Sequence, residues 1–211
     1  LASMEQKGIK VDIKLLKEYK DRSLVYLNEL TQNIYEACGE SFNINSPKQL
    51  GVILFEKLGL ASSKKTKTGY STDESVLESL KNEHKVVPLL LKYREAFKLH
   101  STYIEPLLEL GLKDSENRVF SSFLHTGTTT GRLSSKNPNL QNIPVGAFSD
   151  IQIRRAFIAQ EGYKLVGVDY SQIELRLLAH FSQDKALLEA FRNDLDIHLQ
   201  TAIKIFGEDE A

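Results

Sequence analysis

The 211-residue sequence predicts an α+β fold in which a helical part precedes a part with a small antiparallel sheet and flanking helices. Apolar residues in the first half recur at three- and four-residue spacing, as on one face of a helix. After Pro106 this spacing gives way to short apolar or alternating runs between stretches rich in Gly, Thr, Ser and Asn. We therefore expect one domain over residues 1–110 and a second over residues 111–211.

The first two helices are indicated by residues that favour helix ends. Asp12 is a typical N-cap for a long helix, and Gly39 is a typical stop at its far end. Pro47 suits the first position of a second helix, which we expect to end at about Leu58, before Gly59.

Two further helices are expected before residue 110. Ser71 and Glu74 have the spacing of a capping box at the start of the third helix. The fourth helix is predicted to begin near Pro88 and to reach about Ile104. Residues 62–72, between the second and third helices, form a basic tip with lysines that cannot enter a core.

The second domain is predicted to mix strands and helices. A strand is expected within residues 117–125, followed by a polar loop over residues 126–142. The apolar run at 165–168 fits a short buried strand that ends at Asp169. Helices are expected from Gln172 with an apolar face, and then over residues 185–192 and 197–206.

Composition excludes several classes of protein. The 27 basic and 28 acidic residues give a net charge of −1, so no strongly basic field argues for nucleic acid. The longest wholly apolar run, Val86 to Leu91, is far shorter than the roughly 20 residues that span a bilayer, so no membrane partner is expected. A single cysteine, Cys38, favours a reducing cytoplasmic compartment. The chain does not begin with Met, and we expect a piece of a longer protein.

Asp169 lies where a buried strand is expected to meet a helix. A carboxylate at that position can hold a divalent cation, and the free N–H groups of the first helical turn can face a phosphate. The alternative is that Asp169 simply caps the helix. Glu174 falls in the first turn, where the helix dipole favours an acid whatever its function.

The polar loop, residues 126–142, is rich in groups that can contact a nucleic acid. Asn and Gln side chains offer both donors and acceptors, and an arginine could reach minor-groove acceptors that every base pair presents. The alternative is an ordinary loop without a ligand.

Asp196 and His198 stand at the start of the last predicted helix. A histidine there could donate a hydrogen bond to a phosphate. Taken by themselves, these residues favour the alternative, in which Asp196 is an ordinary helix N-cap and His198 binds no ligand.

Three motifs in order resemble family A DNA polymerases, the bacterial DNA polymerase I class. Residues 169–176, Asp-Tyr-Ser-Gln-Ile-Glu-Leu-Arg, are similar to the first palm motif of that family. Residues 130–135 and 138–144 resemble its template-primer segment, and residues 196–202 resemble the start of its fingers. The basic tip and the long first helix are similar to its thumb. The resemblance implies a helical thumb over residues 1–110 and a partial palm with the start of the fingers over residues 111–211.

The resemblance also implies roles for single residues. It implies that Asp169 and the carbonyl of Tyr170 bind catalytic Mg²⁺, two ions in the intact protein, and that Glu174 acts with Asp169 in catalysis. Primer-template DNA and deoxynucleoside triphosphates are the implied partners. The implied nucleotide contacts are Ser171, Gln172, Ile173, Glu174 and His198, and the implied DNA contacts are Arg132, Asn139, Gln141, Asn142, Lys65 and Lys67.

Two departures from the family pattern qualify the expected activity. Gly146 stands where the family usually has an arginine, and the sequence stops before the family's fingers helix and later His-Asp palm motif. We therefore expect that the parent protein polymerises DNA in replication or repair, in the cytoplasm at the nucleoid, and that these 211 residues alone do not. An incomplete palm also predicts self-association. The alternatives are a non-catalytic DNA-binding module and, more distantly, a metal-dependent hydrolase.

Overall fold

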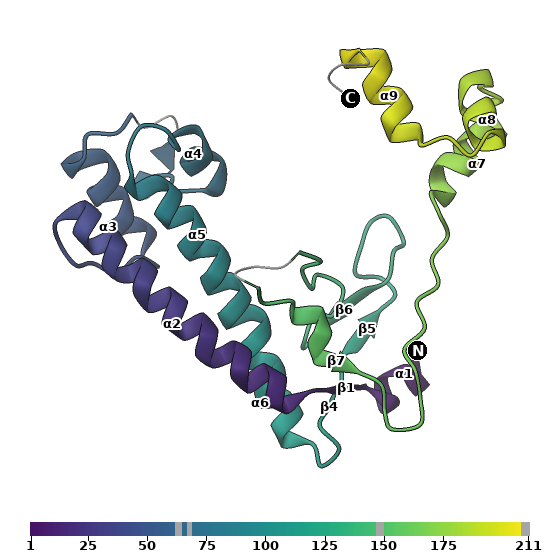
Figure 1. Cartoon of the computed structure of the whole chain (residues 1–211), viewed down its shortest axis with the longest axis horizontal. Coiled ribbons are helices and arrows are strands. Elements are labelled where there is room, and N and C mark those ends of the chain that lie inside the picture. The colour runs from purple at the N-terminus through teal and green to yellow at the C-terminus, as the bar shows by residue number, and fades with distance from the viewer. Residues whose placement is uncertain (62–64, 67–68, 147–149, 208–211) are drawn as a thin grey trace. The chain divides into compact units, whose positions relative to one another are not determined.

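The structure is a computed structural model, and it describes residues 1–61, 65–66, 69–146 and 150–207 (Figure 1). The chain divides into two compact units, a first unit over Leu1–Lys164 and a second unit over Leu165–Ala211. Helices and small antiparallel sheets together confirm the predicted α+β class. Among the described residues, no helix combines the length and the apolar character that crossing a membrane requires.

Helix α2 (Ile13–Cys38) has the ends that the sequence predicts. The Oδ1 atom of Asp12 accepts a hydrogen bond from the backbone N–H of Leu15 at 2.9 Å. Gly39 adopts a left-handed conformation with φ of 76°, which ends the helix. The second predicted helix is also present, as α3 (Pro47–Gly51) followed by a π-helical segment (Val52–Lys57).

Helix α4 (Glu74–Ser79) starts at a different cap from the one predicted. Its N-cap is Asp73, so the capping box of Ser71 and Glu74 is wrong. Arg94 donates to both the backbone oxygen and the Oγ1 atom of Thr72. The Ser71 Oγ atom accepts a hydrogen bond from the N–H of Asp73 at 3.3 Å, a turn before the helix, and α4 begins two residues later than a Ser71 cap would place it.

The fourth predicted helix continues well past Ile104. Helix α5 (Val86–Lys98) leads into a π-helical segment (Leu99–Ile104) and then into α6 (Glu105–Lys113). The wide turn comes directly before Pro106, which has no N–H to donate to a regular helical ladder. The expected domain boundary at residue 110 therefore falls inside α6, and the division into two domains there stays a prediction.

The main sheet joins the N-terminal segment to residues far along the chain. A short helix, α1 (Ala2–Lys7), leads into β1 (Ile9–Val11), which the sequence did not reveal as a strand. This strand lies between β4 (Arg118–Val119) and β7 (Phe157–Ile158), and both pairings are antiparallel. A 3₁₀ turn at Ile153–Ala156 precedes β7.

Two hairpins complete the described strands of the first unit. In one, β2 (Lys65–Thr66) pairs with β3 (Gly69–Tyr70). In the other, β5 (Ser122–Leu124) pairs with β6 (Ser134–Lys136), so the predicted strand within 117–125 is split between β4 and β5. Strand β6 lies inside the polar loop, where the sequence predicted no strand.

The first unit contains two hydrophobic clusters, one toward each end of α2. The cluster near α3 and α4 includes Ile34, Leu54 and Leu90, which are almost completely buried. The other cluster includes Leu16 and Ile153, and it packs the base of the helices against the main sheet. The second cluster therefore fixes the sheet and the polar loop on the helical scaffold.

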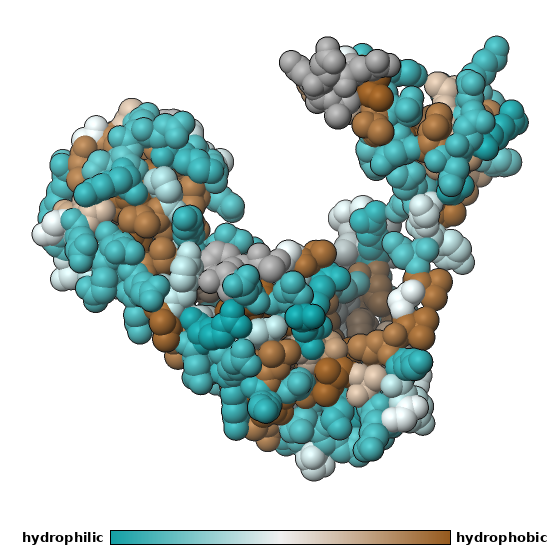
Figure 2. Space-filling view, viewed as in Figure 1, coloured by the Kyte–Doolittle hydropathy of each residue, from teal (hydrophilic) through white to brown (hydrophobic). Residues whose placement is uncertain are grey.

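The described part of the second unit, residues 165–207, contains three helices at the predicted places. These are α7 (Ile173–Ser182), α8 (Lys185–Arg192) and α9 (Ile197–Phe206). The predicted buried strand at 165–169 is wrong: the segment forms no ladder, and Val168 is 91% exposed. A buried strand needs neighbouring strands for its backbone hydrogen bonds and packed layers over its faces, and no described strand pairs with this segment. Figure 2 shows its hydrophobic side chains open at the surface.

Candidate nucleic-acid and metal site

The hairpin of β5 and β6 presents Arg132 in the turn between its strands. Thr128 donates its hydroxyl to the backbone oxygen of Arg132 at 2.8 Å, and Thr130 donates to the hydroxyl of Thr128 at 3.3 Å. The first of these contacts uses the backbone oxygen of Arg132, and Arg132 is an exposed residue. The Thr128 contact therefore holds the turn through the backbone of Arg132.

The segment after β6 is folded around Ser135, whose side chain is buried. The Oδ1 atom of Asn139 accepts hydrogen bonds from the hydroxyl of Ser135 at 3.1 Å and from the N–H of Gln141 at 3.0 Å. The Ser135 oxygen in turn accepts from the N–H of Leu140 at 3.0 Å. Asn139 was predicted to contact DNA, but its side-chain oxygen is used in hydrogen bonds within the loop.

Gln141 and Asn142 also form hydrogen bonds with other residues of the first unit. The side-chain amide of Gln141 donates to the backbone oxygen of Leu133 at 2.9 Å. The hydroxyl of Tyr103, on the π-helical segment after α5, donates to the backbone oxygen of Asn142 at 2.6 Å. The structure therefore brings Arg132, Asn139, Gln141 and Asn142 together in one polar loop.

Three further side chains hold this loop or the residues directly after it, and they were not predicted site residues: Ser121, Arg154 and Tyr103. Ser121 donates its hydroxyl to the backbone oxygen of Pro138 at 2.7 Å. Arg154 donates to the backbone oxygens of Ile143 at 3.0 Å and Pro144 at 3.1 Å. Tyr103 and Arg154 lie outside the polar loop, so no spacing in the sequence links them to it.

The predicted lysines of the basic tip are described only in part. Lys65 is in β2, where it pairs with Tyr70 across the hairpin. Lys67 lies outside the described residues. The phosphate contacts expected of both lysines stay predictions.

In the second unit, Asp169 lies in the exposed segment before α7. The N-cap of α7 is Gln172, with φ of 54°, so the alternative role of Asp169 as the helix cap is wrong. Arg176 donates its Nε to the backbone oxygen of Ser171 at 2.9 Å. The guanidinium of Arg176 also lies 4.5 Å from the centre of the Phe191 ring, which joins α7 to α8.

The remaining predicted nucleotide contacts are on the helices of the second unit. Ile173 and Glu174 lie in the first turn of α7, and both are exposed. Asp196 accepts from the N–H of His198 at 2.8 Å and from that of Leu199 at 3.2 Å, as an N-cap does. The imidazole of His198 is exposed at the start of α9.

The donor set around Asp169 suits a hard cation. Mg²⁺ prefers oxygen ligands, and it is commonly held by one or two carboxylates together with substrate phosphates and water. The Asp169 carboxylate and the Tyr170 carbonyl oxygen are ligands of that kind. Within the described ranges, no three His, Cys, Asp or Glu side chains gather as a metal centre. The oxygens of Asp169 and Tyr170 therefore fit the ligand type that Mg²⁺ prefers.

Known proteins resemble this chain over nearly its whole length. Residues 13–211 match the family model described as DNA polymerase family A. The DNA polymerase I of Caldicellulosiruptor bescii is 51% identical over 211 residues, which are 100% of this chain and 25% of that protein. The DNA polymerase I of Bacillus subtilis is 52% identical over 207 residues, which are 98% of this chain and 23% of that protein.

A solved structure also resembles the chain. It is described as the POL domain of Pol1 from M. smegmatis in complex with DNA primer-template and dNTP. The TM-score is 0.86 at 40% sequence identity, and the match covers 97% of this chain and 36% of that one. The present chain spans about a quarter of the length of the curated relatives it matches.

Proposed function

This chain belongs to DNA polymerase family A, and from that membership we propose that it is part of a DNA-directed DNA polymerase. Such a nucleotidyltransferase adds deoxynucleotides to a primer 3′-hydroxyl along a DNA template, in replication or repair. The observation that carries the proposal is the polar loop, whose internal hydrogen bonds hold its shape while the Arg132 side chain is exposed. The related complex with primer-template and dNTP supports the same partners for this chain. Its proposed compartment is the cytoplasm, at the nucleoid.

Arg132 is proposed to read the shape of a correct base pair in the minor groove. The acceptors there, N3 of purines and O2 of pyrimidines, are common to all pairs, so an arginine can contact them without reading sequence. Asn139, Gln141 and Asn142 are proposed to lie beside the duplex while they hold the loop. Lys65 and Lys67 are proposed to contact phosphates.

The second unit is proposed to receive the deoxynucleotide and its metal ions. Asp169 and the Tyr170 carbonyl would hold Mg²⁺, which when bound neutralises charge on the attacking and leaving oxygens. Ser171, Gln172 and Ile173 would lie beside the triphosphate, and His198 would donate to its phosphates. Glu174 would pack under the sugar and exclude a 2′-hydroxyl.

The reaction so proposed is an in-line displacement at phosphorus. The primer 3′-oxygen forms a bond to the α-phosphorus as the bond from that phosphorus to the bridging oxygen breaks. The hydroxyl proton is lost, and pyrophosphate leaves with the bond electrons. Catalysis of this kind depends on positioning and charge, so the residues of both units serve mainly to orient the reactants.

We propose that the 211 residues alone do not extend a primer. The described carboxylates do not gather into a centre that could hold two cations in a defined geometry. Primer extension by the purified chain tests this, with Asp169→Ala as the control for a contaminating polymerase. Extension that is above background and is lost in Asp169→Ala would overturn the proposal.

A second candidate is a non-catalytic DNA-binding module on the same scaffold, which would use the polar loop alone. The two candidates differ in nucleotide binding. Equilibrium dialysis with a radiolabelled dNTP, Mg²⁺ and primer-template distinguishes them. Retention that Asp169→Ala abolishes supports the polymerase, whereas DNA binding without dNTP retention supports the module.

Self-association through the second unit is a further proposal. Large apolar side chains such as Val166, Phe181 and Ile205 are exposed there. Their burial between copies would remove apolar surface from water. Sedimentation velocity over a concentration series tests this, and a single monomeric species at the highest concentration would contradict it.

A further inference from the structure

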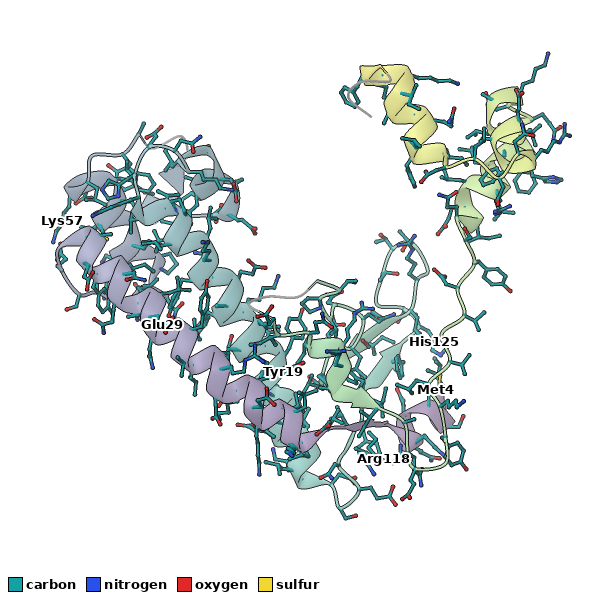
Figure 3. All side chains as sticks on the ribbon, in the orientation of Figure 1. Met4, Tyr19, Glu29, Lys57, Arg118 and His125 are labelled. Atoms are coloured by element: carbon teal, nitrogen blue, oxygen red, sulfur yellow. The ribbon has the colours of Figure 1, made fainter. Side chains whose placement is uncertain are left out.

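The N-terminal helix α1 is held in place mainly by polar contacts. It has six residues, and none of them is buried. Arg118, on β4, donates to the backbone oxygens of Lys7 at 3.2 Å and Gly8 at 3.5 Å. Figure 3 labels Met4 on α1 and Arg118 on β4. Because hydrophobic burial contributes little to holding α1, its position depends on these hydrogen bonds.

Gly8, directly after α1, lets the chain pass very close to β4. It has φ of 59°, and a Cβ atom there would lie 2.7 Å from both the Phe120 ring and the backbone oxygen of Val119. Only glycine fits such an approach without a shift. The segment from α1 to β1 therefore packs closely against Val119 and Phe120, just before β5.

Glu5 extends this contact to the hairpin that carries Arg132. Its Oε1 atom accepts a hydrogen bond from the backbone N–H of Phe123, in β5, at 2.5 Å. Among the described strands, β5 pairs only with β6, so Glu5 takes the place of a strand neighbour at the other edge. A hydrogen bond from an N–H to a carboxylate is stronger than one between neutral groups.

We propose that Glu5 is a positioning residue for the β5–β6 hairpin and, through the hairpin, for the contact of Arg132 with DNA. This inference depends on the proposed function only for the DNA contact. The turn with Arg132 begins directly after β5, at the residue labelled His125 in Figure 3. A change in the anchoring of β5 therefore moves the base of that turn.

The test compares DNA affinities of the full 211-residue chain. Glu5→Ala removes the acceptor, Glu5→Gln keeps an oxygen acceptor without the charge, and Glu18→Ala removes a matched exposed helical charge from α2. Loss of a negative charge does not by itself weaken DNA binding, because the phosphate backbone is also negative. We expect fluorescence anisotropy to give a Kd about tenfold higher for Glu5→Ala and a smaller increase for Glu5→Gln.

A double-mutant cycle separates positioning from a general loss of structure. If Glu5 acts through Arg132, then Glu5→Ala has little further effect in an Arg132→Ala background. Glu18→Ala should leave the Kd unchanged in both backgrounds. Equal Kd values for Glu5→Ala and Glu18→Ala, or an undiminished effect of Glu5→Ala beside Arg132→Ala, would overturn the proposal.

Amide hydrogen exchange tests the anchoring without DNA. The Phe123 amide should exchange about tenfold faster in Glu5→Ala than in the wild-type chain, because its acceptor is lost. It should be unchanged in Glu18→Ala. If wild type binds no primer-template, the proposed DNA site of this chain fails, and the Phe123 exchange rate still decides the role of Glu5. An unchanged rate in Glu5→Ala would contradict that role.

Discussion

The side-chain amide of Gln141 donates to the backbone oxygen of Leu133 over 2.9 Å, and this hydrogen bond closes the polar loop beside Arg132. Leu133 is the neighbour of Arg132 in the chain, so Gln141 holds the strand end from which the arginine projects. Gln141, which is expected to contact DNA, therefore also stabilises the loop. Affinity lost on changing Gln141 would therefore combine a lost contact with a displaced loop.

Asn139 should contribute more to loop stability than its exposed position suggests. Asn139→Ala removes the acceptor of two hydrogen bonds and leaves the buried Ser135 hydroxyl without it, so we expect a loss of about 1–2 kcal/mol in unfolding free energy. Asn139→Asp keeps the acceptor oxygen and is the matched control. Urea unfolding followed by circular dichroism measures both, and equal stability of the two variants would contradict this assignment.

Gly8 and Gly39 allow a comparison of two glycines that both have positive φ but differ in ψ, which is −171° at Gly8 and 6° at Gly39. Gly8 has φ of 59° with close neighbours, whereas Gly39 has φ of 76° and nothing within 4 Å of the position that an added Cβ would occupy. Gly39→Ala should cost about 1 kcal/mol from backbone strain alone. Gly8→Ala should cost about 1–3 kcal/mol more, because of the contact with Phe120 and Val119. Equal losses in thermal unfolding would mean that the Gly8 contact relaxes freely.

His100 is held in one tautomer by Ser23. The Ser23 hydroxyl donates its single proton to the backbone oxygen of Lys20 at 2.8 Å, so it accepts from Nδ1–H of His100, also at 2.8 Å. The Nε2 atom of His100 lies 3.8 Å from a Glu105 carboxylate oxygen. Burial lowers the pKa of His100, an effect that Glu105 opposes and Lys20 reinforces.

This arrangement predicts a loss of stability in mild acid. Because the folded pKa of His100 lies below its ordinary value of 6.5, the unfolded chain binds more protons just below that pH. The contribution of neutral His100 is thus fully present above pH 6.5 and is lost as the pH falls toward the folded pKa. His100→Asn keeps a donor for Ser23 but does not titrate, and it should reduce the pH dependence.

Urea midpoints at about pH 7.5 and about pH 5.5 test the prediction. The exposed His125 provides the control variant His125→Asn, which should behave as wild type does. An equal drop in midpoint for wild type and His100→Asn would show that other groups cause the acid effect.

Local signals predicted most of the helices, though not α1 or α6, and non-local contacts explain most of the missed strands. Asp12 and Gly39 set the ends of α2 through their own backbone neighbours, which the sequence displays. Strand β1 depends on partners more than 100 residues away, at Arg118–Val119 and Phe157–Ile158. Ile9-Lys10-Val11 alternates, but three residues are too few for alternation to indicate a strand.

For the candidate site, the sequence predicted which residues lie together in the polar loop, and their contacts with DNA stay predictions. The residues of the polar loop do come together, but several of their groups bind the loop, and Tyr103 and Arg154 hold it from outside. The apolar run before Asp169 failed as a strand prediction because burial depends on a partner that the run cannot specify. Glu5 gave no signal, since its acceptor role exists only after β5 has folded beside α1.

The central claim is that the polar loop with Arg132 binds primer-template DNA separately from the Asp169 region. The most direct measurement is fluorescence anisotropy of a labelled primer-template across a salt series. It compares wild type, Arg132→Ala, Asp169→Ala and the surface control Arg22→Ala. We expect affinity that falls with salt, a Kd about tenfold higher for Arg132→Ala, and values near wild type for the other two variants. Binding that is indifferent to Arg132, or equally weakened by Arg22→Ala, would contradict the claim.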